Sequence, residues 1–249
     1  MSIIIKSEQE IASMRQSGKI VAAVLEMLKQ KIKPGMKTRE LDALAAREVE
    51  ALGARASFRG YRGFPAGLCA SINDEIVHGI PGERVLREGD IVSLDFGAIS
   101  NGFHGDAAIT VGIGQISPEV KRLTETTEGA LKAGIAAARA EARLGDVSAA
   151  IQHYAESRGY SVVREYTGHG IGRELHEDPQ IPNFGPPGTG PVLKRGMTLA
   201  LEPMVNTGDW RTRLEGDSWT VVTADGGLSA HFEHTVLITG DKPEVLTAL

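Results

Sequence analysis

Residues 95–106 have the sequence "DFGAISNGFHGD", in which two aspartates bracket a stretch with Asn-Gly near its middle. This pattern predicts a β-hairpin, which is the starting point for predicting the fold. In an antiparallel pair, opposed residues have a constant index sum, and the numbers of Asp95 and Asp106 add to an odd value. Any even-length loop, of two or four residues, therefore puts both side chains on the same face of the sheet. With a loop centred on Ser100-Asn101, the two aspartates lie directly opposite each other.

Two like charges in direct opposition destabilise a strand pair. At about 4 Å and an effective dielectric of about 20, the repulsion is roughly 4 kcal/mol. Three arrangements relieve it: one acid is protonated, both acids are exposed, or a cation lies between them. Exposure is the ordinary outcome for a pair of aspartates, but the strand around Asp95, "DIVSLDFGA", is strongly apolar and is predicted to be core.

Three more polar residues lie in apolar or glycine-rich sequence. His169 is in "YTGHGIGRELHEDP" (166–179), where three glycines disfavour a continuous helix and allow a close backbone approach to a site. Glu202 is the only acid in "LALEPM" (199–204), and Glu233 leads into the apolar end of "HFEHTVLIT" (231–239). A buried glutamate is rarely tolerated without a partner.

These residues form one candidate site: Asp95, Asp106, His169, Glu202 and Glu233. Four carboxylates and one imidazole are too many acids for a single ion. They suit two divalent ions, bridged by carboxylates and about 3.5–4 Å apart. The absence of thiolates from the set argues against a structural zinc site.

The composition is that of a globular protein, with 249 residues, 41% hydrophobic and 24% charged. A net charge of −5 does not suggest a nucleic-acid binder. The single cysteine, Cys69, excludes an intramolecular disulfide and fits a reducing compartment. The N-terminus is not a signal peptide, and no apolar run approaches the roughly 20 residues that span a bilayer. We therefore expect a cytoplasmic monomer without a membrane segment or a direct nucleic-acid site.

The order of the predicted elements is two helices followed by strands, twice over. In the first half, Ser7 begins a helix that "KPG" (33–35) ends, and Thr38 caps a second helix ending at Gly53. The strands expected there are 67–72, 91–98 and 104–111. In the second half the helices are 118–143 and 146–158, and the strands are 161–163, 198–204, 219–222 and 230–238.

Strands that do not alternate singly with helices favour an α+β fold with antiparallel strands over a doubly wound parallel sheet. The repeated order is consistent with an internal duplication. We interpret residues 1–249 as a single catalytic domain with an internal pseudo-repeat, approximately 1–115 and 116–249.

The five candidate ligands, together with "HGIP" (78–81), "NGFHGD", "GHGIGRELHE", "EPM" and "FEHT", resemble the type I methionine aminopeptidases nearly end to end. The resemblance implies the pita-bread fold, an α+β fold with a pseudo-two-fold antiparallel sheet and two pairs of outer helices. It also implies hydrolysis of the N-terminal methionine of nascent polypeptides when the second residue is small. The water would be activated by two divalent metal ions, Co, Mn, Fe or Zn.

The resemblance assigns a role to each candidate ligand. Asp95 would bind one metal through both oxygens, and Asp106 and Glu233 would bridge the two metals. His169 and Glu202 would bind the other metal, and we interpret Glu202 as the general base as well.

The resemblance also places the substrate. His78 and His176 would flank the metals and contact the substrate or the tetrahedral intermediate. The methionine side chain would occupy a pocket formed by Phe58, Tyr61, Phe64, Cys69, Leu175 and Trp219. Phe64, Leu175 and Val77 depart from the best-known bacterial pattern, which has Tyr, Phe and Cys there, but the pocket stays apolar.

The resemblance and the charge pattern carry two further expectations. Asn73, Glu75 and Ser229 match a site for a monovalent cation, Na or K. The basic cluster between Lys29 and Lys37 is interpreted as a solvated face, with ribosome contact as the alternative. The rival functions are a proline-directed peptidase of the same fold, a type II enzyme, and a non-catalytic relative. A pattern that begins within the first ten residues argues against the proline-directed peptidases, which usually carry an extra N-terminal domain. The short loop between His169 and Glu202 disfavours the type II enzyme, and the presence of all five ligands disfavours the non-catalytic relative.

Overall fold

The computed structural model describes residues 3–248. Helix α1 (Glu8–Lys31) begins with the predicted capping box: the Glu10 N–H donates to Ser7 Oγ (3.4 Å), and the Ser7 N–H donates to the Glu10 carboxylate (2.9 Å). Val21 and Leu25 on its buried face belong to one hydrophobic core.

The second helix, α2 (Thr38–Ala51), starts one residue earlier than predicted, because its N-cap is Lys37 and not Thr38. The Lys37 N–H donates to the Glu40 carboxylate (2.6 Å). The Thr38 hydroxyl instead accepts the Gly82 N–H (2.8 Å) and donates to the Gly82 carbonyl (3.2 Å). Thr38 therefore attaches the start of the helix to a neighbouring loop.

The third helix, α3 (Pro118–Ala137), ends six residues before the predicted Arg143. Beyond it, the Glu141 N–H donates to the Leu193 carbonyl (2.9 Å), which takes this backbone out of the helical hydrogen-bond pattern. Arg143 is the N-cap of α4 (Leu144–Glu156).

All paired strands of the described chain are antiparallel. The main sheet has nine strands, in the order β1-β4-β5-β14-β9-β7-β8 with β2 on β4 and β15 on β14. Its strands are β1 (Arg55–Ala56), β2 (Cys69–Ile72), β4 (Ile91–Ser100), β5 (Phe103–Gly112), β7 (Thr167–Gly170), β8 (Glu177–Pro182), β9 (Thr198–Leu201), β14 (Glu233–Leu237) and β15 (Glu244–Val245).

Two smaller sheets of three strands flank the main sheet. One consists of β6 (Ser161–Val162), β10 (Met204–Asn206) and β13 (Ser229–His231). The other consists of β3 (Glu75–Val77), β11 (Thr212–Leu214) and β12 (Val221–Thr223). A single 3-10 turn, Tyr61–Gly63, lies between β1 and β2.

The hairpin of β4 and β5 closes through a two-residue loop, because Ser100 pairs with Phe103. Asn101 (φ 52°) and Gly102 (φ 76°) both have positive φ. Positive φ at both central residues is typical of the type I′ turn, whose twist matches the twist of the strands and which Asn-Gly favours.

In this register Asp95 and Asp106 are not directly opposed, contrary to expectation, but they do share one face of the hairpin. Asp95 pairs with Ala108 and Asp106 pairs with Gly97, so the two aspartates are not directly opposite. Because the loop has an even number of residues, both side chains still lie on the same face of the hairpin.

Two predicted strands are interrupted. Residues 198–204 divide into β9 and β10, and residues 230–238 divide into β13 and β14. The Phe232 N–H donates to the Pro203 carbonyl (3.3 Å), so the two interruptions face each other. Glu202 and Glu233 stand next to these interruptions, at the boundary between the main sheet and a smaller one.

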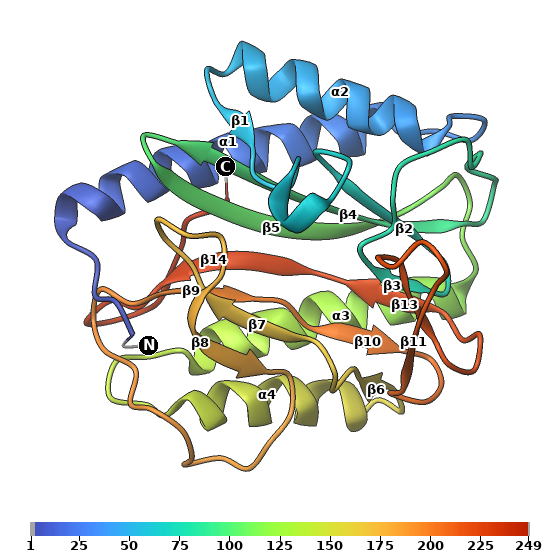
Figure 1. Cartoon of the computed structure of the whole chain (residues 1–249). Coiled ribbons are helices and arrows are strands. Elements are labelled where there is room, and N and C mark those ends of the chain that lie inside the picture. Colours follow the sequence, from blue (N-terminus) through green and yellow to red (C-terminus); the bar gives the residue numbers. More distant parts are fainter. Residues whose placement is uncertain (1–2, 249) are drawn as a thin grey trace.

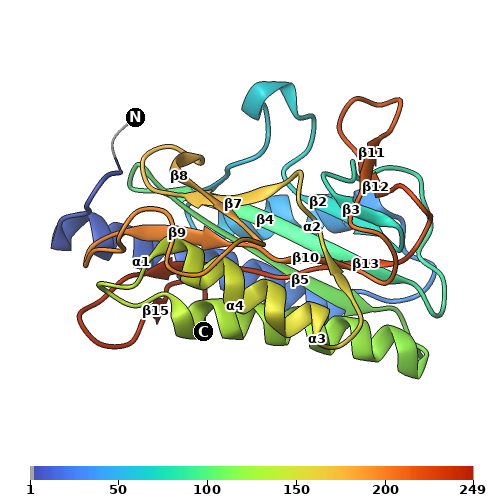
Figure 2. The same cartoon turned by 90° about the horizontal axis from the view of Figure 1, so that it is seen from below.

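The helices form a layer against the sheets. Figure 1 shows α1 and α2 running along β4 and β5, and α3 and α4 running along the strands of the second half. In the view of Figure 2, α1, α3 and α4 lie on one side of the strands and the loops next to β8 and β11 lie on the other. Between residues 3 and 248, no helix has both the length and the hydropathy needed to cross a bilayer.

Helix α1 contacts β5 closely at one point. A Cβ added at Gly105 would lie 2.9 Å from the backbone nitrogen of Gly18 and 3.0 Å from the carbonyl carbon of Ser17. Only glycine at position 105 therefore permits this packing distance, which fixes the strand carrying Asp106 against the helix layer.

Candidate active site

One cavity of about 160 Å³ contains the predicted site. Every predicted metal ligand, both predicted histidines and all six predicted pocket residues line it, together with Arg62. The ligands come from the middle of the main sheet: Asp95 from β4, Asp106 from β5, His169 from β7, Glu202 from the end of β9 and Glu233 from β14.

The ligand atoms converge. One ligand atom each of Asp106, His169 and Glu233 lies within 4.8 Å of those of the other two, and all three residues are buried. Glu202 Oε1 lies 3.5 Å from His169 Nε2. Asp95 lines the same cavity, and its charge acts on Asp106 and Glu202.

Several of these carboxylate oxygens have no hydrogen-bond partner within residues 3–248. They are buried oxygens of Asp95 (Oδ1), Asp106 (Oδ1) and Glu233 (Oε1). Buried carboxylates are normally paired or bound to metal. Arg62 is the one permanently charged cation among the described residues that line the cavity. Its guanidinium lies 5.3 Å from the centroid of the Tyr61 ring and does not hydrogen-bond these carboxylate oxygens. The donor set therefore fits divalent metal ions.

The four carboxyl groups hold their protons tightly when no metal is bound. Burial raises the pKa of Asp95 to about 7. Burial, and then the charges of neighbouring acids, raise the pKa of each of the other three well above its ordinary value: Asp106, Glu202 and Glu233. A divalent cation would replace these protons and remove the repulsion between the acids.

His169 is prepared to act as a neutral ligand. Its Nδ1 donates to the Gly170 carbonyl (2.8 Å), which fixes the tautomer and leaves the Nε2 lone pair facing Glu202. Burial lowers its pKa to about 4, so the ring is uncharged at neutral pH.

The sequence predicts that the glycines beside His169 let backbone approach a site. In the structure they allow the neighbouring strands to pack closely against β7. A Cβ at Gly168 would lie 2.4 Å from the Ala200 carbonyl oxygen, and one at Gly170 would lie 2.1 Å from that of Asp178. The neighbouring strands β9 and β8 occupy that space.

His78 has an unusual backbone conformation, with φ at 61°. Its ring is held edge-on to Tyr166 and Trp219, at centroid distances of 5.9 and 6.4 Å. Burial lowers its pKa to about 4, so this imidazole is also neutral. A strained backbone at a cavity residue is typical of functional sites.

His176 lies at the mouth of the cavity. Its Nδ1 is 2.7 Å from the Tyr61 hydroxyl, and the two rings stack at 5.2 Å. Its ring centroid is 4.3 Å from that of His169. Burial of the ring, and then repulsion from His169, lower its pKa. When Tyr61 donates to Nδ1, the Nε2–H of His176 is free to donate to a ligand.

The remaining part of the cavity is apolar. Phe64 and Trp219 contact edge to face at 5.1 Å, and Phe58 and Leu175 are buried beside them in the same hydrophobic cluster. Cys69 pairs across the sheet with Asp95, and its burial and then that charge raise the pKa of the thiol. Cys69 is thus a wall of the pocket and not an activated nucleophile.

His231 was missed by the sequence analysis. It is buried, its ring nitrogens have no hydrogen-bond partner in the described chain, and its Nε2 lies 4.0 Å from Glu202 Oε2 and 3.9 Å from Glu233 Oε2. His104 is hydrogen-bonded to Ser57, and His234 is hydrogen-bonded to Thr247. Neither histidine lines the cavity.

The three residues predicted to bind a monovalent cation are only partly grouped. The Ser229 N–H donates to the Asn73 carbonyl (2.8 Å), and Ser229 Oγ is buried without a partner in residues 3–248. The Glu75 carboxylate accepts the Ile72 N–H (2.7 Å) and pairs with Arg84. This site stays a prediction.

A cluster of candidate metal ligands lies in the middle of an antiparallel sheet and opens into an apolar pocket, as in a metal-dependent enzyme. The model of metallopeptidase family M24 matches residues 12–240, and the chain belongs to that family. The pita-bread fold expected from the sequence is confirmed by solved structures of its members.

Within that family the chain belongs to the methionine aminopeptidases. It is 53% identical over 247 residues to the methionine aminopeptidase of Clostridium perfringens strain 13, covering 99% of both chains. It is 53% identical over 245 residues to methionine aminopeptidase 1 of Bacillus subtilis strain 168, covering 98% of this chain and 99% of that one.

Solved structures agree. The crystal structure of methionine aminopeptidase from Thermotoga maritima matches with a TM-score of 0.98 and 47% identity over 100% of both chains. Prolidase from Pyrococcus furiosus matches with a TM-score of 0.81, but it is 23% identical and the alignment covers 99% of this chain and 66% of that one. The likeness to prolidase concerns the fold alone.

Proposed function

We propose that this chain removes the N-terminal methionine from polypeptides whose second residue is small, using two divalent metal ions held by its five buried ligands. The observation that carries the proposal is the convergence of Asp106, His169 and Glu233 beside an apolar pocket. Bound there, divalent ions supply a water that ionises near neutral pH and a positive charge for the carbonyl oxygen. Co, Mn, Fe and Zn all suit these ligands.

All five ligands would hold the two ions. Asp95 would serve one ion, His169 with Glu202 the other, and Asp106 and Glu233 would serve both. The neutral His169 contributes a lone pair without adding charge, which leaves the four acids to balance two dications. Their burial excludes competing water and strengthens each contact.

Glu202 is proposed to accept the proton of the attacking water. Glu202 lines the cavity with the other ligands, and with divalent ions bound its carboxylate would be ionised and able to take up a proton. The proton would then pass from Glu202 to the leaving amine.

The two histidines are proposed to hold the substrate. The Nε2–H of His176 would donate to the carbonyl oxygen as negative charge develops on it. His78, fixed between Tyr166 and Trp219, would hydrogen-bond the scissile amide. Both rings are neutral at pH 7, so each has one N–H that can donate and one nitrogen that can accept.

Selectivity would come from two features. The apolar pocket has space for an unbranched side chain, and the flexible thioether of methionine fits such a space. The free α-amine would bind beside Asp95, which restricts the enzyme to chain termini. N-termini of nascent polypeptides are therefore the proposed substrates, and a ribosome is the partner that would present them.

The proposal extends to the setting of the protein. We place it in the cytoplasm as a monomer, with residues 1–249 forming one catalytic domain that arose by internal duplication. A monovalent cation, Na or K, between Asn73 and Ser229 would stabilise the smaller sheets.

Hydrolysis of Met-Ala-Ser tests the function, with acetyl-Met-Ala-Ser and Met-Leu-Ser as matched controls. We expect hydrolysis of Met-Ala-Ser alone, its loss after dialysis against a chelator, and its return with Mn²⁺. Equal hydrolysis of the acetylated peptide, or full activity after removal of metal, would refute the proposal.

A further inference from the structure

The segment just before α1 contacts the loop that carries His176. Lys6 Nζ lies 2.6 Å from Glu177 Oε2, although the two residues are 171 positions apart. Their side chains are only 3% and 5% exposed. Glu177 directly follows His176 and begins β8, so their side chains leave the backbone on opposite sides. The ion pair thus lies on the side of the loop opposite to His176.

Glu177 uses its second oxygen on the loop itself. Its Oε1 accepts the Glu174 N–H (3.3 Å), and the Gly172 N–H donates to the Glu174 carbonyl (3.1 Å). A single carboxylate therefore joins the ammonium of Lys6 to the backbone of loop 172–177. That loop carries the pocket residue Leu175 as well as His176.

The sequence leaves room for the pair at Gly172. A Cβ there would lie 2.4 Å from Lys6 Cε and 2.5 Å from Glu177 Oε1. The Gly172 carbonyl also accepts the His104 N–H (2.8 Å), which ties the loop to β5. The space for the ion pair is thus built into the loop.

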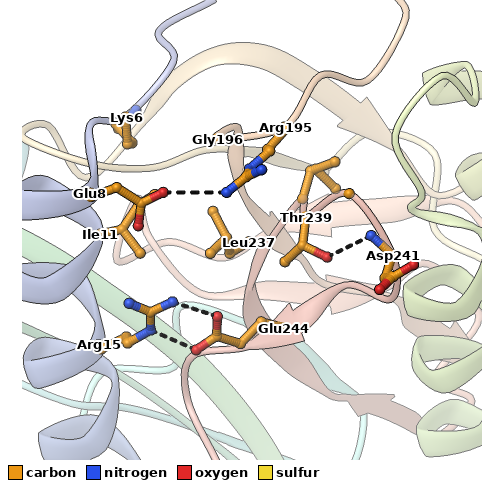
Figure 3. A pocket seen from close by; sticks show the side chains of 12 residues that line it. Lys6, Glu8, Ile11, Arg15, Arg195, Gly196, Leu237, Thr239, Asp241 and Glu244 are labelled. Atoms are coloured by element: carbon orange, nitrogen blue, oxygen red, sulfur yellow. Dashed lines mark hydrogen bonds and ion pairs between the residues drawn. The ribbon is translucent and has the colours of Figure 1, made fainter.

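Two ion pairs near this segment are far more exposed, and a third joins Arg173 of the loop to Glu10 of α1 (3.2 Å). Figure 3 shows the cleft of about 660 Å³ beside the segment, with Glu8 paired to Arg195 and Arg15 paired to Glu244. The side chains of these two pairs are 38–78% exposed, so solvent screens them. They provide a matched comparison for the buried Lys6–Glu177 pair.

We propose that Lys6 is a positioning residue for His176, which it acts on through Glu177 and loop 172–177. The inference rests on the function proposed for His176. Without the ammonium, the buried carboxylate of Glu177 has no counter-charge, and the loop must shift to hydrate it. Misplacing a catalytic group by about 1 Å costs on the order of 100-fold in rate.

Lys6→Met is the test, with Arg15→Met as the control. We expect Lys6→Met to lower kcat for Met-Ala-Ser by about 10- to 100-fold, with KM within about twofold and bound Mn²⁺ unchanged. Arg15→Met should keep the wild-type kcat. Equal losses in both variants, or loss of Mn²⁺ in Lys6→Met, would overturn the proposal.

Hydrogen exchange gives a second readout that needs no activity. In metal-free protein, Lys6→Met should speed exchange of the amides in segment 171–178, and Arg15→Met should not. The double variant Lys6→Met/Glu177→Gln has no buried charge and covers the case in which Lys6→Met does not fold. Because the double variant has no charge to hydrate, we expect its kcat and its exchange to recover toward wild type. A double variant as impaired as Lys6→Met would overturn the inference, because the loss would then not act through the Glu177 carboxylate. Wild-type protein that does not cleave Met-Ala-Ser would refute the proposed function. The exchange result would still test whether the Lys6–Glu177 pair holds loop 172–177 in place.

Discussion

Asp95 and Asp106 stand diagonally across the β4–β5 hairpin, because Asp95 pairs with Ala108, two residues beyond Asp106. Diagonal neighbours on one face are about 7–8 Å apart, against about 4.5–5.5 Å for directly opposed residues. The greater separation leaves space for a cation between the two carboxylates. The Asn-Gly turn that sets the register therefore also sets the spacing of the site.

The metal-free protein should lose stability as the pH rises. The pKa of Asp95 is about 7 in the folded chain, against an ordinary value of 3.8. Between these values the folded state binds more protons than the unfolded state, so the free energy of unfolding falls with increasing pH. We expect the Tm of metal-free protein to fall between pH 5 and about 7, as measured by calorimetry.

Two comparisons check that result. Asp95→Asn, which cannot ionise, should make the dependence of Tm on pH less steep, and the other three buried acids should account for what remains. Saturating Mn²⁺ should remove the dependence, because the ion takes the place of the protons. A metal-free Tm that rises over this range would contradict the assignment of Asp95.

Glu202→Gln keeps the size of the side chain but removes its charge and its basicity. We expect kcat for Met-Ala-Ser to fall by at least about 100-fold, because the variant lacks the proposed base. Bound Mn²⁺, measured by elemental analysis, should fall as well.

His169→Ala should lose metal and activity together. Near wild-type turnover in either variant would remove that residue from the site.

His78→Ala separates substrate contact from metal binding. His78 lines the cavity but is not among the atoms that converge on the cluster. We therefore expect wild-type Mn²⁺ content and a kcat lower by about 100-fold. A loss of bound Mn²⁺ would show that this imidazole has been misplaced in the mechanism.

Gly97 contacts Phe58 in the wall of the proposed methionine pocket. A Cβ at this position would lie 2.9 Å from Phe58 Cε1 and 2.9 Å from Ser57 Cβ. Gly97→Ala should displace Phe58, raise KM for Met-Ala-Ser and destabilise the fold by about 1–3 kcal/mol. Gly216→Ala is the control, because nothing lies within 4 Å of its added Cβ. Kinetics and thermal unfolding of the two variants decide the point.

The sequence predicted those features that depend on parity and on local chemistry. Asp95 and Asp106 share a face under any even loop, whatever the register. The capping box of Ser7 and Glu10 involves only four consecutive positions, so the start of α1 could be read directly. The resemblance to methionine aminopeptidases then supplied the pairing of distant residues that no local pattern contains.

Other features depend on contacts between distant segments. The register of the hairpin required the positive φ of both Asn101 and Gly102. The interruption between β13 and β14 follows from the bond of Phe232 to Pro203, which lies on another strand. His231 carries no motif, and only the tertiary structure brings its ring near Glu202.

Anomalous diffraction from a Mn²⁺-loaded crystal tests the central claim most directly. We predict two peaks in the cavity, about 3.5–4 Å apart, with Asp106 and Glu233 between them. Asp95 should contact one peak, and His169 with Glu202 the other. Peaks found only outside the cavity, or none near Asp106 and Glu233, would contradict the account.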